Sequence, residues 1–270
     1  MLEIRDVRKT FNPGTPNEVR ALQGVTLSLP EGGFTVIIGT NGSGKSTLLN
    51  AVAGSFFPDS GTIHIAGNDV THWPEHRRAS LIGRVFQDPF KGTAPGLSIA
   101  ENLALASLRG QPRGLGLALN ASLRGKIRDA ISALNMGLED RVDNAMGSLS
   151  GGQRQALTLL MATWLKPRLL LLDEPTAALD PKSADKVTAL AGEIVARDKL
   201  TTFMVTHSMQ QAAAFGDRLI MMHRGQPIYD ISGDEKKRVR PAELLERFEE
   251  LRRSELLDEG AAEMLERSYV

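Results

Sequence analysis

Short apolar runs alternate with segments of helical periodicity through much of this chain. Strand-like runs occupy residues 34–39 (FTVIIG), 168–174 (RLLLLDE), 201–207 (TTFMVTH) and 218–225 (RLIMMHRG). Helical segments lie between them, including residues 183–198 (SADKVTALAGEIVARD). Strands that alternate with helices favour a parallel sheet covered by helices on both faces.

Two further regions have other patterns. Residues 1–30 and 58–70 look like short alternating strands with turn residues at their ends, which predicts a small antiparallel piece beside the main sheet. From about residue 98 to 145 the pattern becomes helical. The Gly-rich basic stretch RGQPRGLGLALN, residues 109–120, interrupts it, and we expect a loop there.

The last forty residues form a separate zone. The charge run DEKKRVR is typical of a solvated face. After it, Pro241 suits the first turn of a helix and Gly260 a stop. Apolar residues follow at helical spacing: Leu244, Leu245, Phe248 and Leu251. Packing on the main domain is the favoured interpretation of this amphipathic helix, and docking to a partner is the alternative.

Composition narrows the class of protein. The 32 basic and 32 acidic side chains balance, which argues against a protein that mainly coats nucleic acid. The chain has no cysteine, hence no disulfide and no thiolate metal site, which fits a reducing cytosol. No apolar run approaches the roughly 18 to 20 residues that span a bilayer, and the first residues lack a signal-peptide core. We therefore expect a chain that is soluble by itself and reaches a membrane only through a partner.

The string GTNGSGKST, residues 39–47, lies between the first strand and a helical stretch that stops at Gly54. It is a complete G-x-x-x-x-G-K-S phosphate loop (P-loop) in its strand–loop–helix context. The glycines allow backbone N–H groups to approach phosphate oxygens. Lys45 can reach the β- and γ-phosphates, and the Ser46 hydroxyl can ligate Mg²⁺. A merely structural glycine turn is the much weaker alternative.

The run LLLLDEP ends an apolar strand with two acids. Asp173 can hold a Mg²⁺-bound water, and Glu174 can orient a water for in-line attack on a γ-phosphate. An Asp–Glu pair alone would usually be a solvated strand end. The four leucines and the earlier P-loop favour the functional interpretation.

The string LSGGQ, residues 149–153, has the features of a second anion site. Ser150 is a good N-cap, and the two glycines leave backbone amides bare at a helix start. Because the P-loop already supplies one phosphate site, this one can serve the nucleotide of another copy. A capped helix after a glycine turn is the structural alternative, which a looser string would favour.

Taken in order, GTNGSGKST, LSGGQRQ, LLLLDEPTAALD and VTH resemble the nucleotide-binding subunit of ABC transporters. The resemblance runs from about residue 2 to about residue 230, and LSGGQ is its most specific part. It implies an α/β fold of the P-loop NTPase (RecA-like) type, with a parallel sheet between helices, an antiparallel β subdomain and an inserted helical subdomain at about residues 90–148. We expect an ABC ATPase domain over residues 1–230 and a charged helical extension over 231–270.

The resemblance also implies site residues. Glu174, His207 as the switch histidine and Gln87 of the Q-loop are the catalytic candidates. Phe11 stands where the family carries an adenine-stacking aromatic, although it equally suits the core. Asp180 matches the D-loop aspartate. The nucleotide set is Phe11, Gly39, Thr40, Asn41, Gly42, Ser43, Gly44, Lys45, Ser46 and Thr47; the metal set is Ser46, Gln87 and Asp173; the signature set is Leu149, Ser150, Gly151, Gly152 and Gln153.

The family arrangement implies ATP and Mg²⁺ as cofactors and two subunits that face head to tail. The P-loop of one subunit and the signature set of the other would then clamp one ATP. The implied partners are a second copy or paired ATPase subunit, permease subunits docked on the Q-loop and helical subdomain, and a solute-binding protein, with no nucleic acid. The implied location is the cytoplasmic side of the inner membrane.

Three classes of function were weighed. A small-molecule kinase has no use for LSGGQ or the switch histidine. Ribosome-acting factors usually carry two ATPase halves, and DNA machines a long coiled coil, so a transporter ATPase is favoured over a soluble ABC ATPase. Without a fused membrane domain, an importer of amino acids or related small organic solutes is favoured over an exporter.

Overall fold

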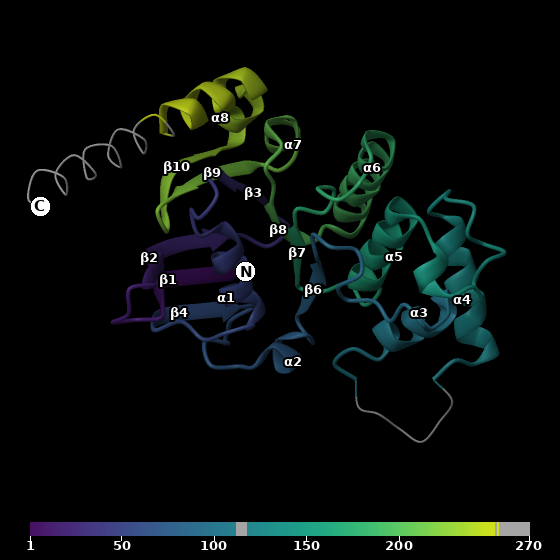
Figure 1. Cartoon of the computed structure of the whole chain (residues 1–270). Coiled ribbons are helices and arrows are strands. Elements are labelled where there is room, and N and C mark those ends of the chain that lie inside the picture. Colours follow the sequence, from purple (N-terminus) through teal and green to yellow (C-terminus); the bar gives the residue numbers. More distant parts are fainter. Residues whose placement is uncertain (112–117, 252, 254–270) are drawn as a thin grey trace, which may run out of the picture.

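The computed structural model describes residues 1–111, 118–251 and 253, and a six-stranded sheet forms its centre (Figure 1). The strand order is β10-β9-β3-β8-β7-β6. These strands are β3 (Phe34–Gly39), β6 (Ile82–Val85), β7 (Leu169–Asp173), β8 (Thr201–Val205), β9 (Arg218–His223) and β10 (Gln226–Ser232). All neighbours pair in parallel except β10, which is antiparallel to β9 at one edge. The α/β fold predicted from the sequence is therefore confirmed.

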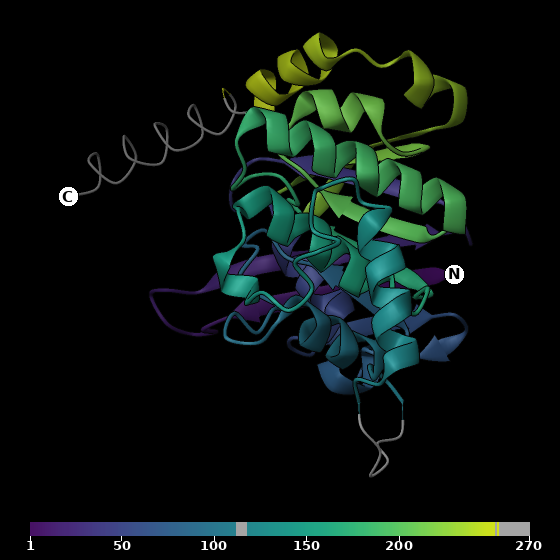
Figure 2. The same cartoon turned by 90° about the vertical axis from the view of Figure 1, so that its right-hand side faces the viewer.

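The central strands are continuously apolar because both of their faces are buried. On β3, Ile37 joins the core with helix α1 (Lys45–Ala53), whereas Val36 and Ile38 join the opposite core with helix α7 (Met209–Ala214). The opposite face also carries helix α6 (Pro181–Asp198), which Figure 2 shows lying along the sheet. The P-loop helix thus occupies one side of the sheet and α6 and α7 the other.

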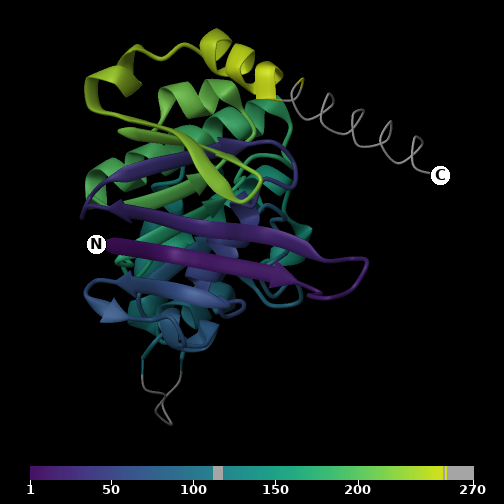
Figure 3. The ribbon, with the colours of Figure 1, turned by 90° about the vertical axis from the view of Figure 1, so that its left-hand side faces the viewer.

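A four-stranded antiparallel sheet covers α1 from outside, as predicted for residues 1–30 and 58–70 (Figure 3). Its order is β2-β1-β4-β5, and its strands are β1 (Leu2–Phe11), β2 (Val19–Leu29), β4 (Ser60–Ile65) and β5 (Asn68–Asp69). Alternate residues of β1, including Leu2 and Ile4, are buried against α1, as expected for a sheet with one solvated face. The end of β1 lies beside the segment that follows α1, because Phe11 packs against Phe56.

A helical region with its own apolar core lies beyond the other edge of the main sheet (Figures 1 and 2). Its elements are α3 (Ile99–Ser107), α4 (Ala121–Ser132), a short 3₁₀ turn (Met146–Ser148) and α5 (Gly151–Thr163); α2 (Glu75–Arg78) lies between β5 and β6. Helix α5 also packs against β6 and α6, so it joins this region to the sheet. Residues 112–117 of the expected loop lie outside the described residues.

The end of the described chain packs against the main sheet. Helix α8 (Gly233–Arg238) is followed by helical backbone that begins at Pro241 and continues to residue 251. Leu244 is buried in the same core as Met221 of β9, whereas Leu245 is about half exposed. The predicted stop at Gly260 lies outside the described residues. Across residues 1–111, 118–251 and 253, no helix is long and apolar enough to cross a bilayer.

Candidate functional site

The P-loop curls between β3 and α1 around its own lysine. The Nζ of Lys45 donates hydrogen bonds to the carbonyl oxygens of Gly39 (2.9 Å) and Thr40 (2.8 Å). Gly39 and Gly44 have φ of 153° and 96°, which disfavour any L side chain. A Cβ at Gly39 would also overlap the carbonyl oxygen of Met222 on β9. The loop therefore depends on glycine both for its backbone angles and for space.

Lys45 links the P-loop to the acids at the end of β7. Burial lowers the pKa of Lys45, and the nearby carboxylates of Glu174 and Asp173 partly oppose that effect. Helix α1 also packs directly on β7 and β8. The structure therefore brings together two sequence motifs that are about 130 residues apart, as the resemblance implied.

Glu174 and His207 form a close pair at the edge of the sheet where β7 and β8 end. Nε2 of His207 lies 2.8 Å from Oε1 of Glu174, whose side chain is only 10% exposed. Glu174 has a φ of 46°, and its N–H donates to the carbonyl oxygen of Val205. A non-glycine residue in the left-handed region costs free energy, and such residues cluster at functional sites. This backbone conformation turns Glu174 away from the direction of strand β7, which ends at Asp173.

Asp173 has a cationic neighbour that the sequence analysis did not single out. Nη2 of Arg84, on β6, lies 3.5 Å from Oδ2 of Asp173, and both side chains are nearly buried. Arg84 also donates to Asn50 of α1 and to Ser55. Burial raises the pKa of Asp173, and Arg84 offsets part of that rise. A lone arginine in a short strand carries no local signal for this role.

Gln87 and Asp173 line one open cavity of about 710 Å³, together with Arg84 and Lys91. The Q-loop candidate therefore faces the same space as the acid at the end of β7. Within the described part of the chain, no group of three or more His, Asp or Glu side chains could hold a metal by itself. Mg²⁺ usually takes one or two protein ligands plus phosphate oxygens and waters. Ser46, Gln87 and Asp173 supply oxygen donors of the kind Mg²⁺ prefers.

Phe11 ends β1 and is partly exposed. Its ring packs edge-on against Phe56, with ring centroids 5.4 Å apart, and Nζ of Lys9 lies 5.6 Å from its centroid. The structure therefore leaves one part of the ring at the surface and packs another. The two interpretations of Phe11, adenine platform and packing residue, are thus compatible.

The signature set lies on the helical side of the molecule. Ser150 caps α5 in a reciprocal capping box: the N–H of Gln153 donates to Ser150 Oγ, and the N–H of Ser150 donates to Gln153 Oε1, both at 3.3 Å. Leu149 belongs to the core shared by α3 and α4. Both Ser150 and Gly151 are exposed. The start of α5 therefore offers an outward-facing helix N-terminus.

The D-loop candidate packs beside that helix start. Asp180 caps α6, its Oδ1 accepting from the N–H of Ser183 at 3.1 Å, and its hydrogen bonds to Ser183 lower the pKa of the carboxyl. A Cβ on Gly152 would lie 2.7 Å from the side chain of Ser183. Close approach of α6 therefore requires glycine in the signature. This packing is a structural reason for a residue that the sequence assigned only to anion binding.

Gln211 connects the segment around His207 to the turn after β7. Its Oε1 accepts from Thr206 Oγ1 and its Nε2 donates to Thr176 Oγ1, both at 2.8 Å. Gln211 cannot be predicted from the sequence, because a glutamine in a short helix has no local signature. These hydrogen bonds hold Thr206, which precedes His207, close to Thr176 in the segment that follows Glu174.

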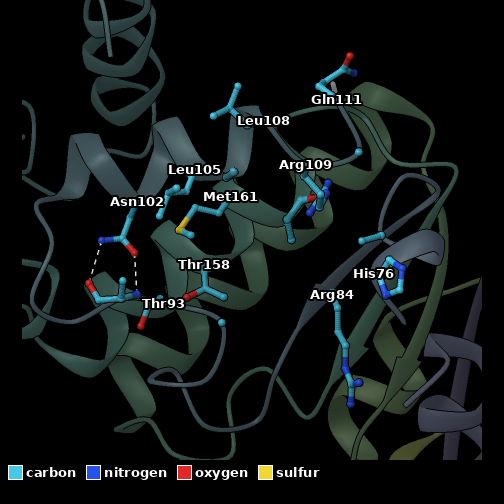
Figure 4. A pocket seen from close by; sticks show the side chains of 16 residues that line it. His76, Arg84, Thr93, Asn102, Leu105, Leu108, Arg109, Gln111, Thr158 and Met161 are labelled. Atoms are coloured by element: carbon cyan, nitrogen blue, oxygen red, sulfur yellow. Dashed lines mark hydrogen bonds between the residues drawn. The ribbon is translucent and has the colours of Figure 1, made fainter. Parts of the chain in front are cut away.

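A second open cavity, of about 590 Å³, lies between the β6 side of the sheet and helices α3 and α5 (Figure 4). We call it the groove. Its titratable lining residues are His76, Arg84 and Arg109. Asn102 is buried and forms two hydrogen bonds with the backbone of Ala94, drawn as dashed lines in Figure 4. The groove therefore has a rigid wall, a basic lining and a surface that joins the helical region to the strand carrying Arg84.

Comparisons with known proteins agree with this geometry. The family model described as ABC transporter matches residues 22–177. The chain is similar to a tyrosine transport ATP-binding protein of Clostridioides difficile, with 40% identity over 251 residues covering 92% of this chain and 99% of the relative. It is also similar to an Fe(3+) ions import ATP-binding protein, FbpC, of Pseudomonas fluorescens, with 36% identity covering 83% of this chain and 59% of that protein.

Among solved structures, the fold matches the ATP-binding cassette MJ0796 in its dimeric post-hydrolysis state bound to ADP and Pi. The TM-score is 0.74 at 29% sequence identity, and the match covers 86% of this chain and 98% of that chain. The structural match and the order of the sequence motifs therefore both indicate an ATP-binding cassette.

Proposed function

We propose that this chain, which belongs to the ABC transporter family and is the ATP-binding, ATP-hydrolysing subunit of such a transporter, powers the import of an amino acid or a related small organic solute. The observation that carries this proposal is the similarity to the tyrosine transport relative, which spans nearly the whole of both chains. The similarity to the iron import relative leaves about two fifths of that protein unmatched. We therefore favour the amino acid over a metal ion as the solute.

The chemistry proposed for the site follows from its charges. Lys45 and the P-loop amides would hold the phosphates, and Glu174 would orient the attacking water as its general base. His207, within hydrogen-bond distance of Glu174, would fix that carboxylate and reach toward the γ-phosphate. Mg²⁺, held by Ser46, Gln87 and Asp173, would neutralise phosphate charge. The contacts of Lys45, Glu174 and His207 at one sheet edge, and of Gln87 and Asp173 in the cavity beside it, support these roles.

We place the complete site between two copies of the chain. Ser150 and Gly151 are exposed at the start of α5 and directly follow Leu149 of the helical core, whereas Lys45 and Glu174 lie at the sheet edge. Two ATP molecules would then join two subunits head to tail, with each nucleotide between one P-loop and the other subunit's signature set. The dimeric state of the matched cassette MJ0796 supports this arrangement.

The groove is the proposed contact with the membrane partner. It is lined by residues of α3, α5 and the segment after β6, and Arg84 lines both the groove and the cavity of Asp173. A short permease helix seated there would touch the Q-loop side and the helical region together. The chain would thereby sit at the cytoplasmic face of the membrane as a peripheral subunit, in a system that also contains a solute-binding protein.

Transport and direction can be tested in the cell that carries the gene. We expect disruption of the gene to abolish saturable uptake of labelled tyrosine and to leave sulfate uptake unchanged. Complementation with the wild-type chain should restore uptake, and complementation with Glu174→Gln should not. Unchanged uptake of amino acids would contradict the proposed solute, and loss of efflux with normal uptake would reverse the proposed direction.

A further inference from the structure

Gln155 lies on α5, five residues after Ser150, and is completely buried. Its Nε2 donates two hydrogen bonds to main-chain carbonyl oxygens: to Phe86 at 3.0 Å and to Pro175 at 2.8 Å. Phe86 immediately precedes Gln87, and Pro175 immediately follows Glu174. One side-chain amide therefore touches the backbone beside two of the three catalytic candidates.

The orientation of this amide follows from its partners. Both neighbours are carbonyl oxygens, which only accept hydrogen bonds, so the NH₂ group must face them. Oε1 of Gln155 is buried and has no hydrogen-bond partner among the described residues. An unsatisfied buried acceptor lowers the stability of the folded state, so packing alone would favour an apolar side chain here. The contribution of the amide is its two hydrogen bonds, one to the backbone beside Gln87 and one to the backbone beside Glu174.

Arg154, the preceding residue, also connects α5 to the Q-loop segment. The guanidinium of Arg154 donates to the carbonyl oxygens of Met146, Gly147 and Leu149, which lead into the signature set. The same guanidinium lies 3.7 Å from the ring centroid of Phe90, a few residues after Gln87. Burial lowers the pKa of Arg154, but the guanidinium stays charged. The second turn of α5 thus contacts the Q-loop segment at two places.

We propose that Gln155 is a positioning residue that ties the signature helix α5 to the Q-loop and to the turn carrying Glu174. A displacement of α5 is then transmitted through Nε2 to the backbone on either side of the catalytic cavity. This inference rests on the proposed function, in which Ser150 at the start of α5 contacts the other subunit's nucleotide. Gln155 touches no nucleotide in this scheme and acts through Gln87 and Glu174.

The first test is Gln155→Met, which keeps the side-chain length and removes the NH₂ donor. We expect kcat for ATP hydrolysis to fall by about 10- to 100-fold, because a displacement of about 1 Å at a catalytic group can cost that much. The Kd for ATP should stay within about twofold, since no P-loop contact changes. Thr163→Val is the matched control, because Thr163 is also buried on α5 and, among the described residues, its hydroxyl donates only to carbonyl oxygens of its own helix. It should leave kcat and Kd unchanged.

A folded Gln155→Met protein with wild-type kcat would overturn the proposal. If that variant fails to fold, hydrogen exchange on Glu174→Gln with and without ATP decides the question. Peptides covering residues 86–88, 151–158 and 175–177 should change protection together, and a change in the two loops without α5 would contradict the link. A wild-type chain that neither hydrolyses ATP nor dimerises would instead refute the proposed function, so the two failures are distinguishable.

Discussion

Nε2 of His207 lies 2.8 Å from Oε1 of Glu174, although the two residues are 33 positions apart. The register of the sheet produces this contact, because β7 and β8 pair in parallel with Asp173 opposite Val205. Both side chains therefore leave the sheet at its carboxyl edge, where α/β folds bind their ligands. The sequence of either strand alone does not predict the contact between His207 and Glu174.

Glu174→Gln tests the proposed general base. The amide keeps the volume and the contact with His207 but cannot accept a proton. We expect hydrolysis to fall by about 10²- to 10⁴-fold, with ATP binding retained because Lys45 and the P-loop are unchanged. Phosphate release and ATP-dependent dimerisation by light scattering measure the two effects. Glu193→Gln, at an exposed site on α6, is the control, and normal turnover by Glu174→Gln would refute the assigned role.

Ser150→Arg tests the composite site between subunits. Ser150 is exposed, so the larger side chain fits the isolated chain but would obstruct a second copy. We expect ATP binding to persist while ATP-dependent dimerisation and hydrolysis are lost. Ser150→Ala separates this effect from loss of the helix cap, which costs about 1 kcal/mol. If the arginine variant dimerises and hydrolyses ATP normally, the nucleotide does not lie between two subunits.

Gly39→Ala tests whether the P-loop needs glycine for space. Its Cβ would overlap the Met222 carbonyl oxygen at a φ of 153°. Gly67→Ala is the control, because Gly67 has a similarly unfavourable φ of 80° with open space around it. We expect Gly67→Ala to lower the free energy of unfolding by about 1–2 kcal/mol, and Gly39→Ala to lower it further and abolish ATP binding. Equal losses from both variants, measured by urea unfolding and nucleotide titration, would contradict this steric account.

Asp173→Asn should stabilise the protein while impairing hydrolysis. Burial raises the pKa of Asp173 above its ordinary 3.8, so the folded state holds this proton more tightly than the unfolded chain does. Ionising Asp173 therefore costs stability as pH rises from about 4 through the raised pKa. At pH 7 the neutral amide avoids burying a charge, and we expect the unfolding midpoint to rise by about 3 °C.

That gain should shrink as pH falls toward 4, because the raised pKa makes the folded carboxyl take up its proton at a higher pH than the unfolded one. Asp129→Asn, an exposed change on α4, should show no comparable gain at pH 7. Thermal unfolding followed by circular dichroism from pH 4 to pH 8 measures the dependence. A lower midpoint for Asp173→Asn at every pH would mean that the ion pair with Arg84 outweighs the cost of burial.

Sequence alone determined the elements whose signal is local. The P-loop is recognised from residues 39–47 because its glycines, Lys45 and Ser46 stand at fixed spacings within one short segment. The four apolar strand segments were predicted correctly, since burial on both faces makes them continuously apolar. Strands β6 and β10 were missed: β6 has only four residues, IGRV, and β10 alternates polar and apolar residues at a sheet edge.

Tertiary structure decided which side chains meet. Arg84 reaches Asp173 across 89 positions because β6 and β7 are neighbours, and Gln155 reaches the backbone of Phe86 and Pro175 because α5 packs on β6. The sequence around Arg84 and around Gln155 has no feature that distinguishes either of them from an ordinary polar residue. A partner across a sheet or between a helix and two loops depends on strand order, register and helix packing, which arise from the burial of the whole chain rather than from the residues nearby.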